Sequence, residues 1–282
     1  MVSSAVVPQH EIVYRHALAV RITHWVNAFC LLVLLLSGLQ IFNAHPTLYF
    51  GEKSAPDRAV LSMDAIQRSD GSYAGITTIS STKFDTTGVL GLSRGANGEL
   101  EGRGFPHWIT LPSYRDLATG RRWHFFFAWA WIINGLCYLG WSLASRHLRD
   151  DLAMRRSDWR GISRSIADHL RFRHPNGDAA TRYNPLQKLA YLGVIFVLTP
   201  LIILTGLSMS PQLDSLMGGF IQFVGGRQSA RTLHFIAMSL FVLFTVVHVL
   251  MVVYAGPINE LRSMITGRFR VRYPRAGEGG HD

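Results

Sequence analysis

Two histidines, His234 and His248, lie fourteen residues apart in a stretch that carries no formal charge after Arg231. In an α-helix, fourteen residues turn through about 1400°, roughly 40° short of four full turns, so both imidazoles leave the same face. They would lie about 21 Å apart along the axis, which in a bilayer places one near each surface. Ionisable groups inside a membrane span are costly and usually functional. The spacing therefore predicts one helix that presents two metal-binding imidazoles to one interior.

The composition favours a membrane protein, because 48% of the 282 residues are hydrophobic and only 16% are charged. Four uncharged stretches are long enough for a bilayer, which needs about 20 apolar residues per helix. These predicted spans are 22–43, 123–145, 189–209 and 232–254, with a proline kink at Pro200 in the third. The chain is therefore predicted to be an all-α membrane protein, a four-transmembrane-helix bundle that forms a single domain over residues 1–282.

The distribution of charge predicts the orientation. The loop 146–188 carries ten Lys or Arg against five Asp, and the carboxyl-terminal tail is also rich in Arg. By the positive-inside rule, this loop and both termini are expected in the cytoplasm, with residues 44–122 outside. That long insert contains 10 Gly and 4 Pro and short strand-like pieces such as 75–80. The formal net charge of +10 is thus explained by membrane orientation, and we expect no nucleic-acid partner.

The predicted topology groups four histidines into two pairs. His24 begins the first span at the inner surface, where the fourth span places His248. His124 begins the second span at the outer surface, where the fourth span places His234. Paired neutral imidazoles are axial ligands of haem, and bundle cores hold such cofactors between facing helices. The pattern predicts two b haems, since no CxxCH motif indicates a covalent haem; an interfacial role at the lipid headgroups is the alternative for each histidine.

Four other residues could contact the haems, but each also has an ordinary structural explanation. Gly38 lies fourteen residues after His24, where the lack of a side chain would let a flat macrocycle approach, although small residues also serve helix packing. Arg21, Arg122 and Arg231 lie close to the ligands and could pair with haem propionates, or they could anchor helix ends at the interface.

Four sequence features carry a resemblance to a known family: the RxxHW run from Arg21 to Trp25, the outer-level histidine His124 of the second span, the fourteen-residue histidine spacing in the fourth, and RYNPLQKLAYLG from Arg182 to Gly193. The chain resembles the bacterial di-haem cytochrome b subunits of nickel-iron hydrogenases and formate dehydrogenases. It is also similar to the thiosulfate-reductase-like or b561-type cytochromes that accompany molybdopterin oxidoreductases. The resemblance covers the four spans and the inner loop, whereas the long 44–122 segment departs from the hydrogenase and formate dehydrogenase subunits.

This resemblance implies an electron-transfer and anchor subunit in the bacterial inner membrane, rather than a catalytic subunit. It would carry electrons between membrane quinone and a periplasmic oxidoreductase, a molybdopterin or similar enzyme, that docks on the 44–122 insert. In the related formate dehydrogenase subunit the quinone lies near the inner haem, which makes Asn184, Gln187 and Lys188 candidate quinone contacts. Helix capping and interface anchoring are the alternatives for these three residues.

Two other functions are compatible with the sequence. One is a free-standing b-type cytochrome that oxidises superoxide or reduces a small substrate with quinone; the size of the insert argues against it. The other is a carrier that moves metal ions through its histidines. Ion pathways usually need acidic groups in the membrane, and none of the predicted spans contains Asp or Glu.

Overall fold

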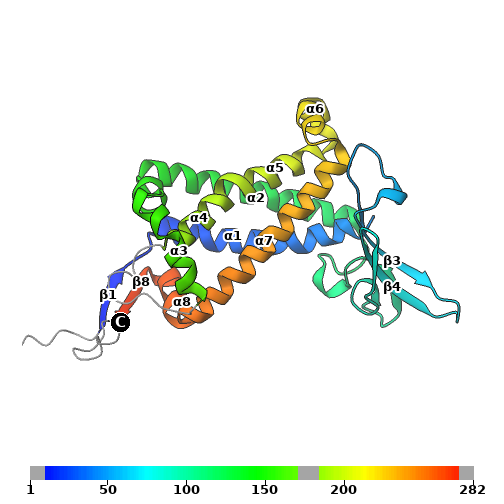
Figure 1. The fold of residues 1–282 in the computed structure, drawn as a ribbon, viewed down its shortest axis with the longest axis horizontal. Helices are drawn as coiled ribbons and strands as arrows, with labels where there is room; N and C mark the ends of the chain where they lie inside the picture. The colour runs from blue at the N-terminus through cyan, green and yellow to red at the C-terminus, as the bar shows by residue number, and fades with distance from the viewer. Residues whose placement is uncertain (1–9, 171–183, 273–282) are drawn as a thin grey trace, which may run out of the picture. The chain divides into compact units, whose positions relative to one another are not determined.

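A computed structural model of the chain describes residues 10–170 and 184–272 (Figure 1). Four helices in this described part are long and apolar enough to cross a membrane. They are α1 (Leu18–Phe42), α2 (Leu117–Ala144), the α4–α5 stretch (Pro185–Ser208) and α7 (Arg227–Ala255). Each begins four to six residues before the predicted span and ends within one residue of it. The predicted spans begin after the charged residues at the helix starts, whereas the helices include these residues and so begin earlier than the apolar stretches.

The third long helix is irregular where a kink was predicted. It consists of α4 (Pro185–Gly193), a π-helical turn (Val194–Leu198) and α5 (Thr199–Ser208). Pro200 lies in the first turn of α5 and has no N–H to donate to the preceding turn. Prolines and single π-helical turns are both recognised causes of helix kinks.

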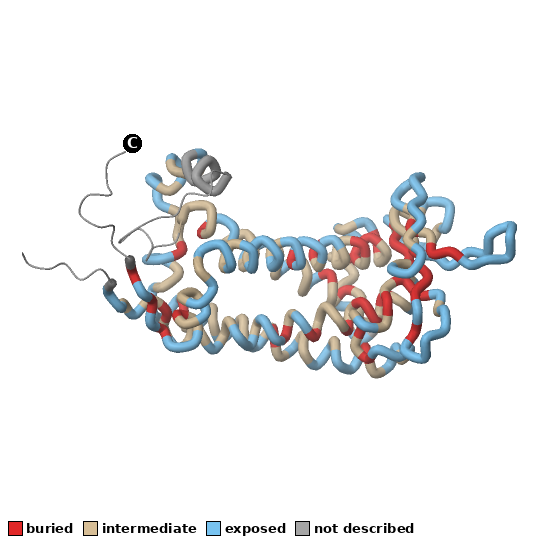
Figure 2. Tube along the Cα trace, turned by 90° about the horizontal axis from the view of Figure 1, so that it is seen from below, coloured by how far each residue is buried: buried red, intermediate tan, exposed pale blue. Residues whose placement is uncertain are grey.

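The surfaces of the four long helices are apolar and largely uncovered by protein. Within the apolar stretch of each helix, 33% of the residues are buried in α1 and 11% in each of the other three. Figure 2 shows the corresponding exposed stretches along these helices in pale blue. In water this much exposed apolar surface would be unfavourable, so lipid is the solvent that suits it.

Contacts divide the chain into two compact units, and each of the four long helices contributes to both. The first unit comprises residues 1–25, 135–197 and 242–282, of which the structure describes 10–25, 135–170, 184–197 and 242–272. It contains a two-stranded antiparallel sheet of β1 (His10–Tyr14) and β8 (Arg268–Arg272). It also contains α3 (Arg156–Leu170) and α8 (Pro257–Thr266). Arg15 ties the sheet to α8 through an ion pair with Glu260 at 3.2 Å.

The second unit comprises residues 26–134 and 198–241 and contains the insert. A four-stranded antiparallel sheet has the order β2 (Thr47–Leu48), β3 (Leu61–Gln67), β4 (Tyr73–Ile79) and β5 (Thr82–Asp85). A second hairpin pairs β6 (Gly91–Arg94) with β7 (Leu100–Arg103), and α6 (Asp214–Phe223) precedes α7. The strand-like piece at 75–80 falls almost entirely within β4. The helical prediction thus holds for the apolar stretches, whereas the insert and the two ends contribute strands that an all-α fold does not include.

The insert is attached to the long helices by a small hydrophobic core. Phe42 at the end of α1 is buried with Leu48 and Met63 of the insert, and Phe235 of α7 packs against this group. The rings of Phe42 and Phe235 lie 4.8 Å apart. Within the insert, Gly91 has φ of +75°, and an added Cβ would lie 2.7 Å from the carbonyl oxygen of Asp64. Glycine is therefore required where β6 approaches β3.

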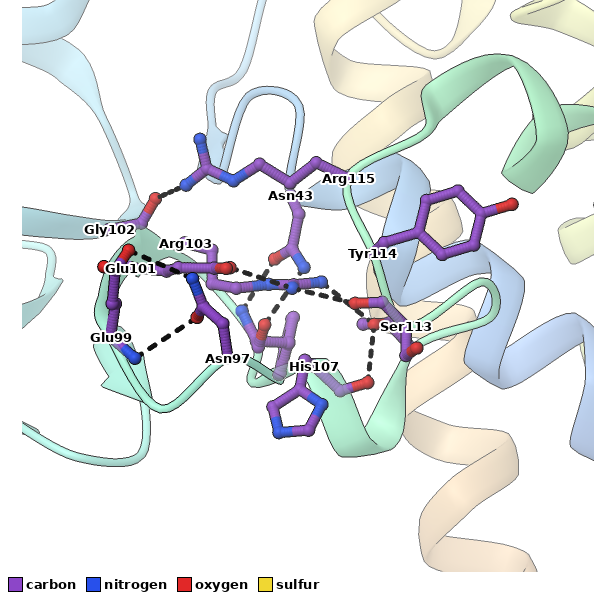
Figure 3. A network of polar contacts seen from close by, with 12 residues as sticks. Asn43, Asn97, Glu99, Glu101, Gly102, Arg103, His107, Ser113, Tyr114 and Arg115 are labelled. Atoms are coloured by element: carbon purple, nitrogen blue, oxygen red, sulfur yellow. Dashed lines mark hydrogen bonds and ion pairs between the residues drawn. The ribbon is translucent and has the colours of Figure 1, made fainter. Parts of the chain in front are cut away.

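A buried polar network forms the second attachment (Figure 3). The guanidinium of Arg103 is almost fully buried, with the residue 3% exposed. It donates to Gln40 Oε1 on α1 at 3.0 Å, to Thr110 Oγ1 at 2.9 Å and to the carbonyl of Ser113 at 3.0 Å, and it pairs with Glu101 at 3.3 Å. A buried cation is tolerated only with such partners.

Candidate functional site

His124 on α2 and His234 on α7 face each other in the second unit. Their ring centres lie 6.3 Å apart, and the ring planes are inclined by 64°. The sequence predicted this pair from depth alone, and the structure brings the two side chains together from helices that are more than a hundred residues apart.

The Nδ1 atoms of this pair both have hydrogen-bond partners. His234 Nδ1 lies 3.0 Å from the carbonyl oxygen of Ile202 and 3.1 Å from Thr205 Oγ1. A carbonyl oxygen can only accept, so Nδ1 carries the ring proton. His124 Nδ1 lies 3.1 Å from Ser37 Oγ, whose own proton is donated to a backbone carbonyl at 2.6 Å. In both rings Nε2 is therefore left with its lone pair, as metal ligation requires.

His24 on α1 and His248 on α7 form the second predicted pair, within the first unit. Their ring centres lie 6.2 Å apart with the planes inclined by 55°. The ring of Phe244 stacks on His248 at 6.1 Å. His24 differs from His124 and His234, because its Nδ1 is buried and has no hydrogen-bond partner among the described residues.

The donor sets fit an iron that is already held by a macrocycle. The described residues contain no group of three or more His, Cys, Asp or Glu that could hold a metal ion. Two imidazoles that bond one metal from opposite sides, at about 2 Å each, need ring centres roughly 6 Å apart. The separations of 6.2 and 6.3 Å meet this requirement. In haem, the porphyrin provides the remaining ligands and the protein provides the axial ones.

The three arginines singled out by the sequence have different surroundings. Arg21 donates to a backbone carbonyl of α8 at 2.7 Å, and its Nε is buried without a partner among the described residues. Arg122 is exposed and lies 3.3 Å from Thr119 Oγ1. Arg231 holds the start of the insert, because it donates to the carbonyl oxygens of His45 and Thr47. Of the three, Arg21 retains the buried donor that an anionic group would satisfy.

Gly38 lies against a histidine ring rather than in open space. A Cβ added there would lie 3.3 Å from His124 Cε1, which is tighter than ordinary contact. Gly206 on α5 has the same relationship to His234, at 3.2 Å. Sequence reasoning identified Gly38 as a residue that makes room for a macrocycle and missed Gly206 entirely. Both glycines make room for an imidazole.

The proposed quinone contacts are engaged in local structure. Asn184 caps α4 by accepting from the Leu186 amide at 3.0 Å, and Gln187 completes a capping box by accepting from the Asn184 amide at 3.2 Å. Lys188 is 8% exposed and pairs with Asp158 of α3 at 3.0 Å. An ammonium group has three donors, so Lys188 keeps hydrogen-bonding capacity beyond this ion pair.

Comparison with known proteins places these features in a family. The family described as prokaryotic cytochrome b561 matches residues 15–267. A relative in Azospira oryzae, named "Putative protein-methionine-sulfoxide reductase subunit YedZ1", is 27% identical over 259 residues, which is 91% of this chain and 98% of the relative. No solved structure matches the chain. The chain belongs to the prokaryotic cytochrome b561 family and is accordingly a multi-pass membrane protein that binds haem b and carries electrons.

Proposed function

We propose that the protein holds two haems, one between His24 and His248 and one between His124 and His234. It would carry electrons between membrane quinone and a periplasmic oxidoreductase. The observation that supports this is a repeated geometry: each pair joins two different long helices with ring centres 6.2 or 6.3 Å apart. Bound haem supplies reversible one-electron chemistry whose potential is set by axial ligation, burial and neighbouring hydrogen bonds.

The residues of the chain would hold and orient the axial rings. The Nδ1 contacts of His124 and His234 fix the tautomer and leave Nε2 free to bind the iron. Phe244 restricts the ring of His248 by stacking on it. The buried Nε of Arg21, one turn before His24, is the best placed of the three proposed propionate donors. Arg122 is exposed and would have to turn away from Thr119 Oγ1 to reach such a group. Arg231 could bind it only through N–H groups that do not already donate to His45 and Thr47.

Quinone exchange is proposed beside His24 and His248, at the cytoplasmic side in the orientation that the charge distribution favours. Lys188 lies three residues before Tyr191, whose ring is 6.3 Å from that of Phe244. Phe244 in turn stacks on His248, so these contacts connect α4 to the inner histidine pair. The remaining donors of Lys188 suit a quinone carbonyl.

The redox partner is proposed to dock on the 44–122 insert, which the same orientation places in the periplasm. The name of the Azospira relative describes a subunit of a sulfoxide reductase, and this supports a redox enzyme as the partner. A molybdopterin-dependent or similar oxidoreductase is the proposed class. The chain would then be the membrane anchor and electron carrier of that complex.

Haem stoichiometry tests the proposal directly. The full chain in detergent should contain about two non-covalent b haems, because four axial imidazoles serve two irons. His24→Ala, His124→Ala, His234→Ala and His248→Ala should each lower the haem content by one. His45→Ala, which removes an exposed histidine of the insert, is the matched control and should keep both haems. The proposal is overturned if the unaltered protein contains only one haem, or if each of the four ligand variants still contains two.

A further inference from the structure

One short sequence pattern occurs twice in the second unit. Residues 34–39 of α1 read LLLSGL, and residues 202–207 of α5 read IILTGL. Each copy consists of aliphatic residues followed by a hydroxyl residue, a glycine and a leucine. We call Ser37–Gly38 and Thr205–Gly206 the two hydroxyl–glycine pairs. Both lie on helices that carry no member of the His124–His234 pair.

The hydroxyl groups of the two copies make the same contacts. Ser37 Oγ donates to the carbonyl oxygen four residues earlier at 2.6 Å and lies 3.1 Å from His124 Nδ1. Thr205 Oγ1 donates to the carbonyl oxygen four residues earlier at 2.7 Å and lies 3.1 Å from His234 Nδ1. Because each hydroxyl proton is used within its own helix, each hydroxyl oxygen is an acceptor for the proton of the histidine ring. In His234 the carbonyl oxygen of Ile202, at 3.0 Å, shares this proton with Thr205 Oγ1.

The glycines of the two copies also correspond. An added Cβ at Gly38 would lie 3.3 Å from Cε1 and 3.6 Å from Nδ1 of His124. At Gly206 the same distances to His234 are 3.2 and 3.6 Å. Any larger residue would therefore push on the ring that the preceding hydroxyl holds. The hydroxyl fixes the direction of the imidazole, and the glycine allows the supporting helix to lie close behind it.

The His24–His248 pair lacks this support. No glycine of the described residues has its Cβ position against either ring. The Nδ1 of His24 is buried without a hydrogen-bond partner in the same part of the chain. The two histidine pairs thus have similar ring separations but different hydrogen bonding at the far side of the ring.

We propose that the two hydroxyl–glycine pairs are a duplicated positioning device that orients His124 and His234 and lowers the reduction potential of the haem between them. The inference rests on the proposed function. A hydrogen bond donated by Nδ1 increases the basicity of Nε2, and a more basic axial ligand favours ferric over ferrous iron. The His24 ring lacks this hydrogen bond, so S37A and T205A should leave the haem between His24 and His248 unaffected.

The test uses Ser37→Ala and Thr205→Ala in the full haem-loaded chain. Redox titration followed by visible and electron paramagnetic resonance spectroscopy should show two haems in each variant. One midpoint potential should rise by roughly 59 mV, while the other stays constant. For a one-electron couple this shift corresponds to about a tenfold change in the ratio of ferric to ferrous haem at a given potential. Ser37→Thr and Thr205→Ser keep the hydroxyl and should restore the original potential. Ser239→Ala is the control, because Ser239 is an exposed hydroxyl of α7 that donates to Phe235 at 2.9 Å.

Gly206→Ala gives a second measurement that does not depend on the hydroxyl variants. The added methyl group should turn the ring of His234 and change the resonance spectrum of one haem. The inference is overturned if both potentials stay unchanged in S37A and T205A, or if S239A shifts a potential as much. If His124→Ala and His234→Ala retain both haems, the proposed function itself fails. If these two variants lose one haem but the potentials do not respond to S37A or T205A, only the positioning role fails.

Discussion

Nη2 of Arg103 donates a hydrogen bond of 3.0 Å to Oε1 of Gln40, across 63 residues of sequence. Arg103 ends a strand of the insert, and Gln40 lies in the last turn of α1. Both residues are buried, at 3% and 4% exposure. The position of the insert on the long helices therefore depends on a polar contact as well as on the hydrophobic core around Phe42.

Replacing Arg103 by leucine should loosen the insert. The change leaves the buried Gln40 and Thr110 acceptors unpaired, and each unsatisfied buried group costs about 1–3 kcal/mol. We expect the free energy of unfolding to fall by about 3 kcal/mol and the insert to become sensitive to protease, as thermal melts and limited proteolysis would measure. Arg94→Leu removes an exposed arginine of the same hairpin and should change neither readout. An R103L protein that melts like the unaltered protein would show that the network is dispensable.

Lys188→Gln should impair quinol oxidation. The variant removes the ammonium donors proposed to contact the quinone, so the KM for quinol should rise several-fold in steady-state assays. Asp158→Asn is the comparison, since it weakens the 3.0 Å ion pair with Lys188 but keeps the ammonium group, and it should leave KM unchanged. If KM responds equally in both variants, loss of the ion pair explains the effect and Lys188 is not a quinone contact.

The proposed docking surface can be tested by replacing two exposed aromatic residues of the insert. Tyr73 and Phe84 lie on β4 and β5 with 57% and 48% exposure. The register pairs Thr77 with Phe84, and Tyr73 is four residues before Thr77, so both aromatic side chains lie on one face of the sheet. Charged replacements at aromatic anchors of an interface cost about 2 kcal/mol or more.

We therefore expect Tyr73→Glu combined with Phe84→Glu to slow haem oxidation by a periplasmic extract at least tenfold while haem content stays constant. Stopped-flow spectroscopy on membranes would measure the rate. Tyr14→Glu is the matched control, because Tyr14 is 66% exposed and belongs to the segment expected in the cytoplasm. An unchanged rate in the double variant would place the docking surface elsewhere.

The long helices and the histidine pairs could be predicted because both follow from simple periodic constraints. A stretch of about 20 uncharged residues has few alternatives to a membrane helix. Once the helices alternate in direction, the depth of each histidine follows from its position in its helix, and the fourteen-residue spacing keeps His234 and His248 on one face. The structure brings together the two pairs obtained in this way.

The supporting residues could not be predicted from one sequence. Ser37 and Thr205 look like the small polar residues that are common in membrane helices, and their contacts depend on how separate helices pack. The burial of Arg103 is equally hidden, because a charged residue in a glycine-rich segment is normally solvated. The pairing of β1 with β8 joins segments about 250 residues apart, which no local pattern indicates.

His16 should make the protein sensitive to acid. It lies between β1 and α1, is 8% exposed, and is close to the positive charges of Arg15 and Arg21. Burial, followed by the charge of Arg15 and weaker contributions from its other neighbours, including His24 and His147, lowers the pKa of His16 from 6.5 to about 4. Between these two values the unfolded chain binds more protons than the folded one, so the stability that His16 contributes is complete above pH 6.5 and is lost as pH falls toward 4.

The size of this effect is on the order of 3 to 4 kcal/mol at most, since each pKa unit corresponds to about 1.4 kcal/mol. Thermal melts of the full chain in detergent between pH 4 and 7 should therefore show a falling midpoint that His16→Gln flattens. The matched control is His107→Gln, which changes a partly exposed histidine of the insert and should keep the original pH dependence. If H16Q melts with the same pH dependence as the unaltered protein, the acid sensitivity belongs to other groups and His16 is protonated without cost.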